Sequence, residues 1–268
     1  MKSIIKKIIP FSLGKKLRGI YQRFLGIYYF GKRFTCPYCG NTFRKMLPGG
    51  STLPKNAEMR IIGGGRRNNC VCPRCYATDR DRLIYLYLNQ HSDFLEKELK
   101  VLHVAPSGSL KAFIKRQSNI SYQEGIKYHE GFYYAKDIAI IDITNLSFED
   151  NSFDVIFCNH VLEHVIEDNV AMKELHRVLK PNGWAILQVP ISAILEETFE
   201  DFSKTTEKER EEHFGQFDHV RIYGSDYKDR LADAGFKVDV IHPEKDWKSN
   251  NFEKYAINKE EKLYVVHK

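Results

Sequence analysis

The feature that most restricts the fold is an alternation of short apolar runs and helical patterns that begins at Lys100. Amphipathic spacing predicts helices over residues 168–180 and 225–234, which end at Pro181 and Gly235. Strand-like runs cover residues 100–105, 120–124, 137–142, 153–159, 183–190, 236–243 and 262–268. Because strands that alternate with helices are typical of βαβ units, we predict an α/β domain with a largely parallel sheet.

Upstream of this region the sequence shows little apolar periodicity, but it contains the two pairs CPYC and CPRC. They supply four candidate ligands, Cys36, Cys39, Cys72 and Cys75. Four thiolates on two tight turns suit the closed tetrahedral shell of a structural Zn²⁺ ion. We therefore predict a zinc ribbon over residues 34–80, in a reducing, cytoplasmic compartment. Cys70 is the spare cysteine, because its C-x-C spacing fits the same shell less easily.

The beginning of the chain is strongly basic. Residues 1–57 contain twelve Lys and Arg and no Asp or Glu, whereas the rest has 29 Lys and Arg against 35 Asp and Glu. Residues 1–33 show two short amphipathic patterns, one built on Ile4, Ile5, Ile8 and Ile9, the other on Leu13, Leu17, Ile20 and Phe24. Two interpretations stay open: this head lies peripherally on the inner face of a membrane, or its apolar stripe packs on the protein's own body.

Candidate ligand-binding residues follow the central strands, where a doubly wound sheet binds its ligand. They are His103, Ala105, Pro106 and Ser107 after the first strand, Glu124 at the end of the second, Asp142 and Ile143 after the third, and Asn159 and His160 after the fourth. The small residues of the first turn allow close backbone approach, and Glu124 has the spacing of a carboxylate that binds ribose hydroxyls. Asp142 suits an adenine amino group, which Ile143 would cover.

Two stretches resemble the type 11 group of class I S-adenosylmethionine (SAM)-dependent methyltransferases. They are DITNLSFEDNSFDVIFCNHVLEHVIEDNVAMKELHRVLKPNGWAILQVP (142–190) and FGQFDHVRIYGSDYKDRLADAGF (214–236). With CPYC, CPRC and DRDRLIYLYL, the chain from about residue 34 is similar to a bacterial subgroup that carries an N-terminal zinc ribbon.

The resemblance implies a Rossmann-like seven-stranded methyltransferase sheet of order 3-2-1-4-5-7-6, with the last strand antiparallel. It implies SAM as the cofactor, beside structural Zn²⁺. The expected organisation is a basic amphipathic head (1–33), the zinc ribbon (34–80), a linking helix (81–99) and the methyltransferase domain (100–268).

The cofactor loop departs from the family pattern. Where the family at large has an acidic residue and D-x-G-x-G-x-G, this chain has His103, Ala105, Ser107 and Ser109. His103 cannot replace the acid that faces the methionine amino group, and Pro106 lacks a backbone donor. The replacements are small, and the ribbon-bearing subgroup has a similar L-H-x-A-P, so we interpret the loop as a variant cofactor loop.

The resemblance predicts methyl transfer to a small-molecule or glycan acceptor, on oxygen. His219 is the first candidate base because HVRIY lies where the family places substrate-side residues, and His160 is the second. Arg221 suits an anionic group, and the charged stretch 191–218 is a candidate lid. An RNA methyltransferase and a non-catalytic SAM-fold binding module remain alternatives; the acidic body and the lack of an N/D-P-P-Y/F motif disfavour RNA.

Overall fold

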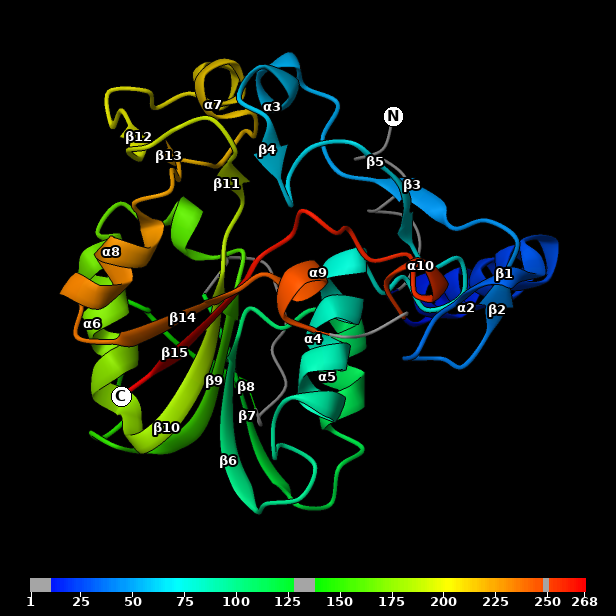
Figure 1. Cartoon of the computed structure of the whole chain (residues 1–268), viewed down its shortest axis with the longest axis horizontal. Helices are drawn as coiled ribbons and strands as arrows, with labels where there is room; N and C mark the ends of the chain where they lie inside the picture. The colour runs from blue at the N-terminus through cyan, green and yellow to red at the C-terminus, as the bar shows by residue number, and fades with distance from the viewer. Residues whose placement is uncertain (1–10, 128–137, 248–250) are drawn as a thin grey trace.

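The computed structural model describes residues 11–127, 138–247 and 251–268, and its largest part is a seven-stranded sheet (Figure 1). The strands are β6 (Leu99–Val104), β7 (Ile120–Ile126), β8 (Ile138–Ile140), β9 (Phe153–Asn159), β10 (Leu179–Gln188), β14 (Lys237–Ile241) and β15 (Leu263–His267). From β8 the spatial order is β8-β7-β6-β9-β10-β15-β14, and β15 runs antiparallel to both neighbours. Numbered along the chain this order is 3-2-1-4-5-7-6, which confirms the predicted fold class.

Helices cover both faces of this sheet (Figure 1). α4 (Asp79–Gln90) and α5 (Gly108–Ile114) lie on one face, and α6 (Asp168–Val178) and α8 (Tyr227–Asp233) lie on the other. Side chains alternate between these two layers along β9: Val155 and Phe157 pack towards α4 and α5, whereas Ile156 and Cys158 pack towards α6 and α8. Burying such apolar side chains contributes about 1.5–3 kcal/mol each, so both layers stabilise the sheet.

Several element boundaries differ from the sequence-based expectation. The helix expected to end at Lys180 ends at Val178, because the chain joins β10 through an irregularity before Trp184. The helical pattern after Asp79 ends at Gln90, and eight residues separate it from the start of β6. The chain leaves the helix there, and the His91 ring stacks on Trp247 with ring centroids 4.2 Å apart.

The ribbon segment is built from two small antiparallel pairs. β1 (Phe30–Thr35) pairs with β2 (Thr42–Phe43), and β3 (Leu47–Gly49) pairs with β5 (Arg67–Val71). Each pair includes a strand that leads directly into one C-x-x-C turn.

The charged segment expected to form a lid is part of a folded cap above the carboxyl ends of the sheet (Figure 1). The cap consists of α3 (Pro54–Glu58), β4 (Ile61–Ile62), β11 (Ile191–Ser192), β12 (Phe199–Glu200), α7 (Glu207–Phe214) and β13 (Arg221–Ile222). β11 pairs with β4, and β12 pairs with β13. Asn56 Nδ2 donates to the Gly215 carbonyl at 2.7 Å, and Ser192 Oγ to the Met59 carbonyl at 2.7 Å. The ribbon segment therefore holds this stretch in place.

A single buried arginine joins three parts of the chain. Arg82 in α4 is fully buried, and its guanidinium donates to five backbone carbonyls, those of Asn69, Cys70, Ala77, Tyr255 and Ala256. These carbonyls belong to the ribbon, to the turn before α4 and to the segment after α10 (Asn251–Lys254). Losing these hydrogen bonds would leave several buried carbonyls without donors.

At the other end of the molecule, α2 (Phe11–Tyr28) projects with β1 as an arm (Figure 1). It contains the second pattern of the head, while the pattern at Ile4–Ile9 lies outside the described residues. No helix in the described ranges combines the length and the apolar composition needed to cross a bilayer.

Candidate functional site

The structure gathers the four predicted cysteine ligands into one cluster. Their sulfur atoms lie within 4.8 Å of one another, with Cys36 Sγ 3.5 Å from Cys75 Sγ and Cys39 Sγ 3.8 Å from Cys72 Sγ. A tetrahedral Zn²⁺ with bonds of about 2.3 Å places its sulfurs about 3.8 Å apart, so the cluster has the dimensions of a zinc site.

Both C-x-x-C turns have the same backbone geometry. Gly40 N–H donates to the Cys36 carbonyl at 2.8 Å, and Tyr76 N–H donates to the Cys72 carbonyl at 3.0 Å. Gly40 and Tyr76 have positive φ values of 69° and 62°, which reverse the chain and bring both sulfurs of each pair to one side. Repetition of one turn geometry explains how two short sequences build one four-sulfur cluster.

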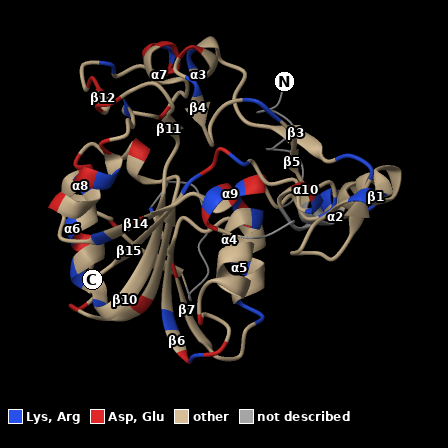
Figure 2. Cartoon of the chain, in the orientation of Figure 1, with Lys and Arg blue, Asp and Glu red and all other residues tan. Residues whose placement is uncertain are grey.

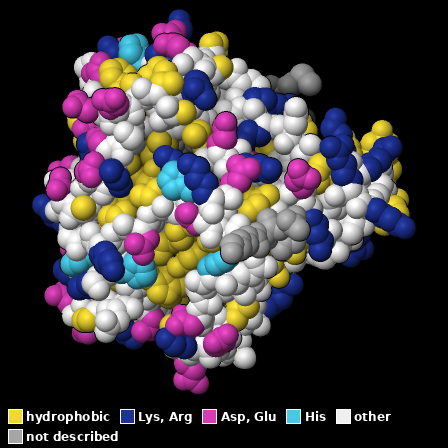
Figure 3. Space-filling model, viewed as in Figure 1, with side chains coloured by type: hydrophobic (Ala, Val, Ile, Leu, Met, Phe, Trp, Pro, Cys, Tyr) yellow, Lys and Arg dark blue, Asp and Glu magenta, His cyan; other side chains and the backbone are white. Residues whose placement is uncertain are grey.

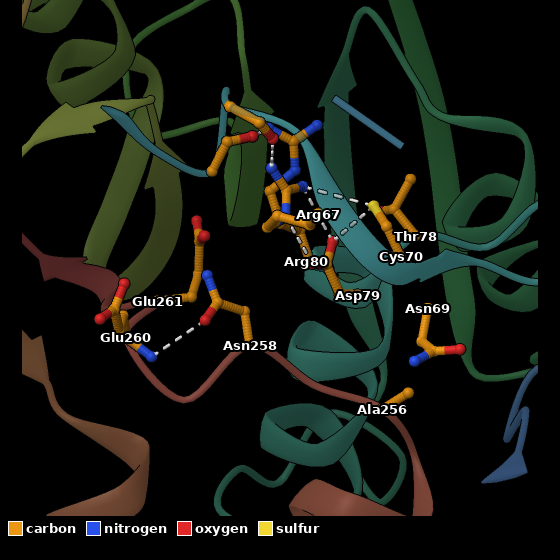
Figure 4. A network of polar contacts seen from close by, with 12 residues as sticks. Arg67, Asn69, Cys70, Thr78, Asp79, Arg80, Ala256, Asn258, Glu260 and Glu261 are labelled. Carbon is orange, nitrogen blue, oxygen red and sulfur yellow. Dashed lines mark hydrogen bonds and ion pairs between the residues drawn. The ribbon is translucent and has the colours of Figure 1, made fainter. Parts of the chain in front are cut away.

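Cys70 lies outside this cluster, in a polar network between the ribbon and α4 (Figure 4). Its thiol donates to Asp79 Oδ1 at 3.3 Å, and Arg67 Nε donates to Asp79 Oδ2 at 2.6 Å. Burial and the charge of Asp79 raise the pKa of the Cys70 thiol, which disfavours the thiolate that a metal requires.

At the carboxyl edge of the sheet, Asn159 and Asp142 are available to a ligand. Asn159 ends β9, and its Oδ1 atom is buried without a hydrogen-bond partner in the part of the chain that the structure describes. Such an atom needs a donor, which a bound ligand would supply. Asp142 is exposed after β8, with Oδ1 accepting from Thr144 N–H at 2.9 Å, and Ile143 beside it is buried.

The turn after β6 has an unusual backbone. Ala105 is exposed with φ at 47°, a left-handed conformation in which glycine is the usual residue, and Pro106 follows it half-buried. Ser107 Oγ donates to Asp81 Oδ1 at 2.9 Å, so a carboxylate from α4 holds this turn. The His103 ring lies in the layer beneath α5, with Nδ1 3.0 Å from the Tyr122 hydroxyl, which leaves only its backbone for a cofactor.

Glu124, which we expect to bind the ribose, lies beside two lysines. It lies two residues before the end of β7, and its carboxylate, 2% exposed, forms ion pairs with Lys111 and Lys115 of α5. The spacing of about twenty residues was a correct guide to the strand, but the two lysines that bind Glu124 become its neighbours only when α5 packs on β7.

The histidine candidates converge on Glu163, a residue that sequence reasoning did not select. Glu163 is buried on the short 3₁₀ turn Leu162–His164 that follows β9. His160 Nδ1 lies 3.2 Å from Glu163 Oε1, and His164 Nε2 lies 4.0 Å from the same atom. The ring of His219 packs edge-on against His164 with centroids 4.8 Å apart. The i, i+3 spacing of His160 and Glu163 was the available signal.

Burial sets the charge states in this cluster. It lowers the pKa of His160 and lowers that of His219 to about 4, so both rings are neutral near pH 7. Burial by itself raises the pKa of Glu163, but the hydrogen bond with His160 and the other histidines lower it to about 2. The Glu163 carboxylate therefore lies beside two rings, His160 and His219, whose burial favours the neutral form.

Arg221 does not face an open ligand site. It is 1% exposed, and its guanidinium donates to Glu200 Oε2 at 2.8 Å and to the carbonyls of Leu162, Val165 and Ile166. Its role is to join the turn after β9 to the cap, which corrects the expectation of an anion-binding arginine.

Comparison with known proteins gives a family match for the central part of the chain. A family model described as a methyltransferase domain matches residues 100–187. The match runs from β6 to β10 and so includes the carboxyl edge with Asp142 and Asn159.

Two relatives match shorter segments. An uncharacterised protein of Methanocaldococcus jannaschii is 44% identical over 63 residues, which are 23% of this chain and 28% of that protein. A demethylmenaquinone methyltransferase of Staphylococcus haemolyticus is 49% identical over 45 residues, 17% of this chain and 19% of that protein. The chain thus covers less than a third of the length of the curated relatives it matches.

Among solved structures, a SAM-dependent methyltransferase from Archaeoglobus fulgidus has a TM-score of 0.45 at 13% identity, covering 72% of this chain and 96% of that one. The complex of the Haloferax volcanii Trm112 methyltransferase activator with a putative methyltransferase gives a TM-score of 0.40 at 16% identity, covering 64% and 83%.

Proposed function

We propose that the chain is a SAM-dependent methyltransferase that acts on oxygen of a small-molecule or glycan acceptor. The observation that carries this proposal is the methyltransferase-domain match over residues 100–187, which falls on a sheet with the full 3-2-1-4-5-7-6 order. The ligand-binding edge of that sheet has an exposed turn at Ala105, an exposed Asp142 and an unpartnered Asn159 Oδ1.

These residues fit a cofactor that carries an adenine ring and an ammonium group. In the proposed site, Asp142 accepts from the adenine amino group, Ile143 covers the ring, and Asn159 Oδ1 accepts from a polar hydrogen of the ligand. The backbone from Ala105 to Ser107 lies against the remaining chain of the cofactor. Glu124 is the proposed ribose contact, and its two lysine partners lie beside it.

When bound, SAM supplies a methyl group that its sulfonium has already activated, so the protein needs alignment and one proton acceptor. His160 is the better placed of the two candidate bases. His160 Nδ1 lies 3.2 Å from both Glu163 Oε1 and Arg80 Nη1; in the tautomer that donates Nδ1–H to Glu163, the lone pair is on Nε2, which is buried and has no hydrogen-bond partner in the described ranges. Glu163 then orients His160 and stabilises the ring when it takes up the proton.

Calorimetry with SAM tests the cofactor site. Removing Asn159 or Asp142 by substitution with Ala is expected to weaken SAM binding by on the order of 1–3 kcal/mol, because each leaves a ligand donor unpaired. Glu149→Ala removes an exposed carboxylate from the same stretch and is expected to bind like wild type. Absence of SAM binding by the wild-type protein would favour the non-catalytic alternative.

Labelled SAM tests the acceptor class. Wild-type protein and His160→Gln are incubated with methyl-labelled SAM and separate pools of small metabolites, glycans and RNA. Label is expected in the small-molecule or glycan pool, at least about tenfold faster with wild type, since general-base catalysis contributes roughly 10²–10⁴-fold. Label confined to RNA would replace this proposal with the RNA alternative.

We also propose that the arm docks on an anionic membrane surface. Six apolar or aromatic side chains of α2 are exposed: Leu17, Ile20, Tyr21, Phe24, Ile27 and Tyr28. The arm carries Lys and Arg but no Asp or Glu, as Figure 2 shows for the arm in the right of the view. Figure 3 shows basic and hydrophobic side chains side by side on it, which is the composition that binds the headgroup boundary of anionic bilayers.

A further inference from the structure

The cluster around Glu163 contains a second group of potential metal ligands, separate from the cysteines. One ligand atom each from Glu163, His164 and His219 lies within 4.8 Å of the others. Glu163 is 1% exposed, and its Oε2 atom has no hydrogen-bond partner in the described part of the chain. A buried carboxylate oxygen without a donor is costly, and in a native protein it commonly faces an ion or an ordered water.

Neighbouring groups orient these side chains as the outer shell of a metal site does. His164 Nδ1 lies 3.2 Å from the Asp218 carbonyl oxygen and 3.3 Å from Asp218 Oδ2, which turns Nε2 towards Glu163. His160 Nδ1 contacts Glu163 Oε1 and leaves Oε2 as the unpartnered atom. A metal-binding histidine usually donates its second ring N–H to a carbonyl or carboxylate in this way.

There is also space for a further ligand. A cavity of about 10 Å³ is lined by Glu163 and His219, with apolar walls from Pro190, Phe214 and Ile222. This is roughly the space that one water molecule occupies, and three protein ligands with one open position are typical of catalytic zinc sites. His164 is partly exposed, so an ion has a route from solvent.

One positive side chain beside this cavity has its own partners. Arg221 lines the same cavity, but it donates to Glu200 and to backbone carbonyls, and it lies 3.6 Å from Asp168 Oδ2. The charge of Arg221 is therefore matched by Asp168 and Glu200.

We propose that Glu163, His164 and His219 bind a divalent transition-metal ion, in addition to the zinc expected in the ribbon. Two imidazoles and one carboxylate suit Zn²⁺ or Fe²⁺, whereas Mg²⁺ and Ca²⁺ prefer oxygen ligands throughout. Ligand atoms around an ion with bonds of about 2.0–2.2 Å lie about 3–4 Å apart. The three ligand atoms therefore move about 1 Å closer to one another when the ion binds. His219 then serves as a metal ligand and leaves proton transfer to His160.

Metal stoichiometry tests this site without any acceptor or cofactor. Protein saturated with Zn²⁺ and freed of excess ion by gel filtration is expected to contain two zinc ions per chain. Glu163→Gln and His219→Gln are each expected to contain one, whereas His213→Gln, which changes a nearby histidine outside the cluster, is expected to retain two. One zinc per wild-type chain, or two in both cluster variants, would overturn the proposal.

Co²⁺ spectra distinguish the two sites, and zinc content and circular dichroism detect misfolded variants. With the ribbon filled by zinc, added Co²⁺ is expected to give weak visible bands of a nitrogen and oxygen site, without thiolate charge transfer. Glu163→Gln is expected to lose these bands while its ribbon still binds one zinc and its far-ultraviolet circular dichroism stays that of wild type. Bands unchanged in Glu163→Gln and His219→Gln would refute the site. None of these results depends on methyl transfer, so they also separate this proposal from the proposed function.

Discussion

Glu261 is a buried carboxylate, and burying its charge reduces the stability of the folded state. It is 2% exposed, its Oε1 accepts from Gln188 Nε2 at 3.0 Å, and its Oε2 has no hydrogen-bond partner in the residues the structure describes. Burial, only partly offset by Arg80, raises the pKa of Glu261 to about 6. Figure 4 shows it near the network that joins Arg80 and Asp79.

A raised carboxyl pKa makes the folded state bind the proton more tightly than the unfolded state. Stability from this group is complete below the unfolded pKa of about 4.5 and falls as the pH rises to about 6. Glu261→Gln should therefore gain free energy of unfolding relative to wild type as the pH rises, by about 1 kcal/mol between pH 5 and pH 7.5. Denaturant titrations at both pH values measure this. Glu260→Gln, an exposed neighbour, should show no such change, and an equal difference at both pH values for Glu261→Gln would contradict the assignment.

Among the elements, α2 is distinguished by an apolar face that is exposed in the described part of the chain. Ile20, Phe24 and Ile27 are 62%, 61% and 77% exposed and follow one another at three- and four-residue spacing. The other interpretation of the head, packing against the body of the protein, does not apply to these side chains.

Replacing Ile20, Phe24 and Ile27 with Ser is expected to release the protein from anionic vesicles although its charge is unchanged, because membrane binding requires the buried apolar area as well as the charge. Vesicle sedimentation measures binding. A control with Ser at Ile166, Ile194 and Phe217, three apolar residues that are 48–56% exposed elsewhere, is expected to sediment like wild type. Equal sedimentation of both variants would argue against docking through α2.

At the scale of the whole molecule, the ribbon is attached to the candidate cofactor turn. Ser109 Oγ donates to the Cys75 carbonyl at 3.1 Å, and the Tyr38 hydroxyl donates to the Asp81 carbonyl at 2.8 Å. Asp81 in turn accepts from Ser107. The start of α5 is thus positioned by a C-x-x-C turn rather than by the methyltransferase domain alone.

This coupling predicts that the expected ribbon zinc supports SAM binding at a distance. The Cys39→Ser, Cys72→Ser double variant should lose one zinc per chain and bind SAM about tenfold more weakly, ~1.4 kcal/mol. Cys70→Ser should retain the zinc content and the SAM affinity of wild type, since Cys70 lies outside the four-sulfur cluster. Metal analysis with calorimetry decides this, and full SAM affinity in the zinc-free double variant would show that the contacts at Ser107 and Ser109 carry no coupling.

The sheet could be predicted because its signals are local. Each strand of the seven-stranded sheet has its own apolar run, and side-chain alternation follows from strand geometry. The cysteine cluster could also be predicted from the sequence, since a C-x-x-C turn brings two sulfurs together within four residues. Asp142 and Asn159 could be selected as candidates because they stand at or just after the ends of strands, and that position can be predicted from the sequence.

Other features depend on contacts between distant segments. Glu124 has the expected spacing, but α5 directs two lysines onto it. Arg82 and Arg221 look like surface residues in the sequence, yet both are buried because backbone carbonyls from remote segments surround their guanidinium groups.

By itself the sequence determined the order of strands and helices, the four-sulfur cluster and the positive charge of the arm, all of which follow from local patterns and residue types. Only the tertiary structure decided that residues 51–65 pack against the 191–218 stretch, that three histidines meet one buried carboxylate, and that the apolar face of α2 is exposed among the described residues. The physical reason is that burial and partner choice depend on which remote groups displace water from a side chain, and spacing along the chain does not encode that.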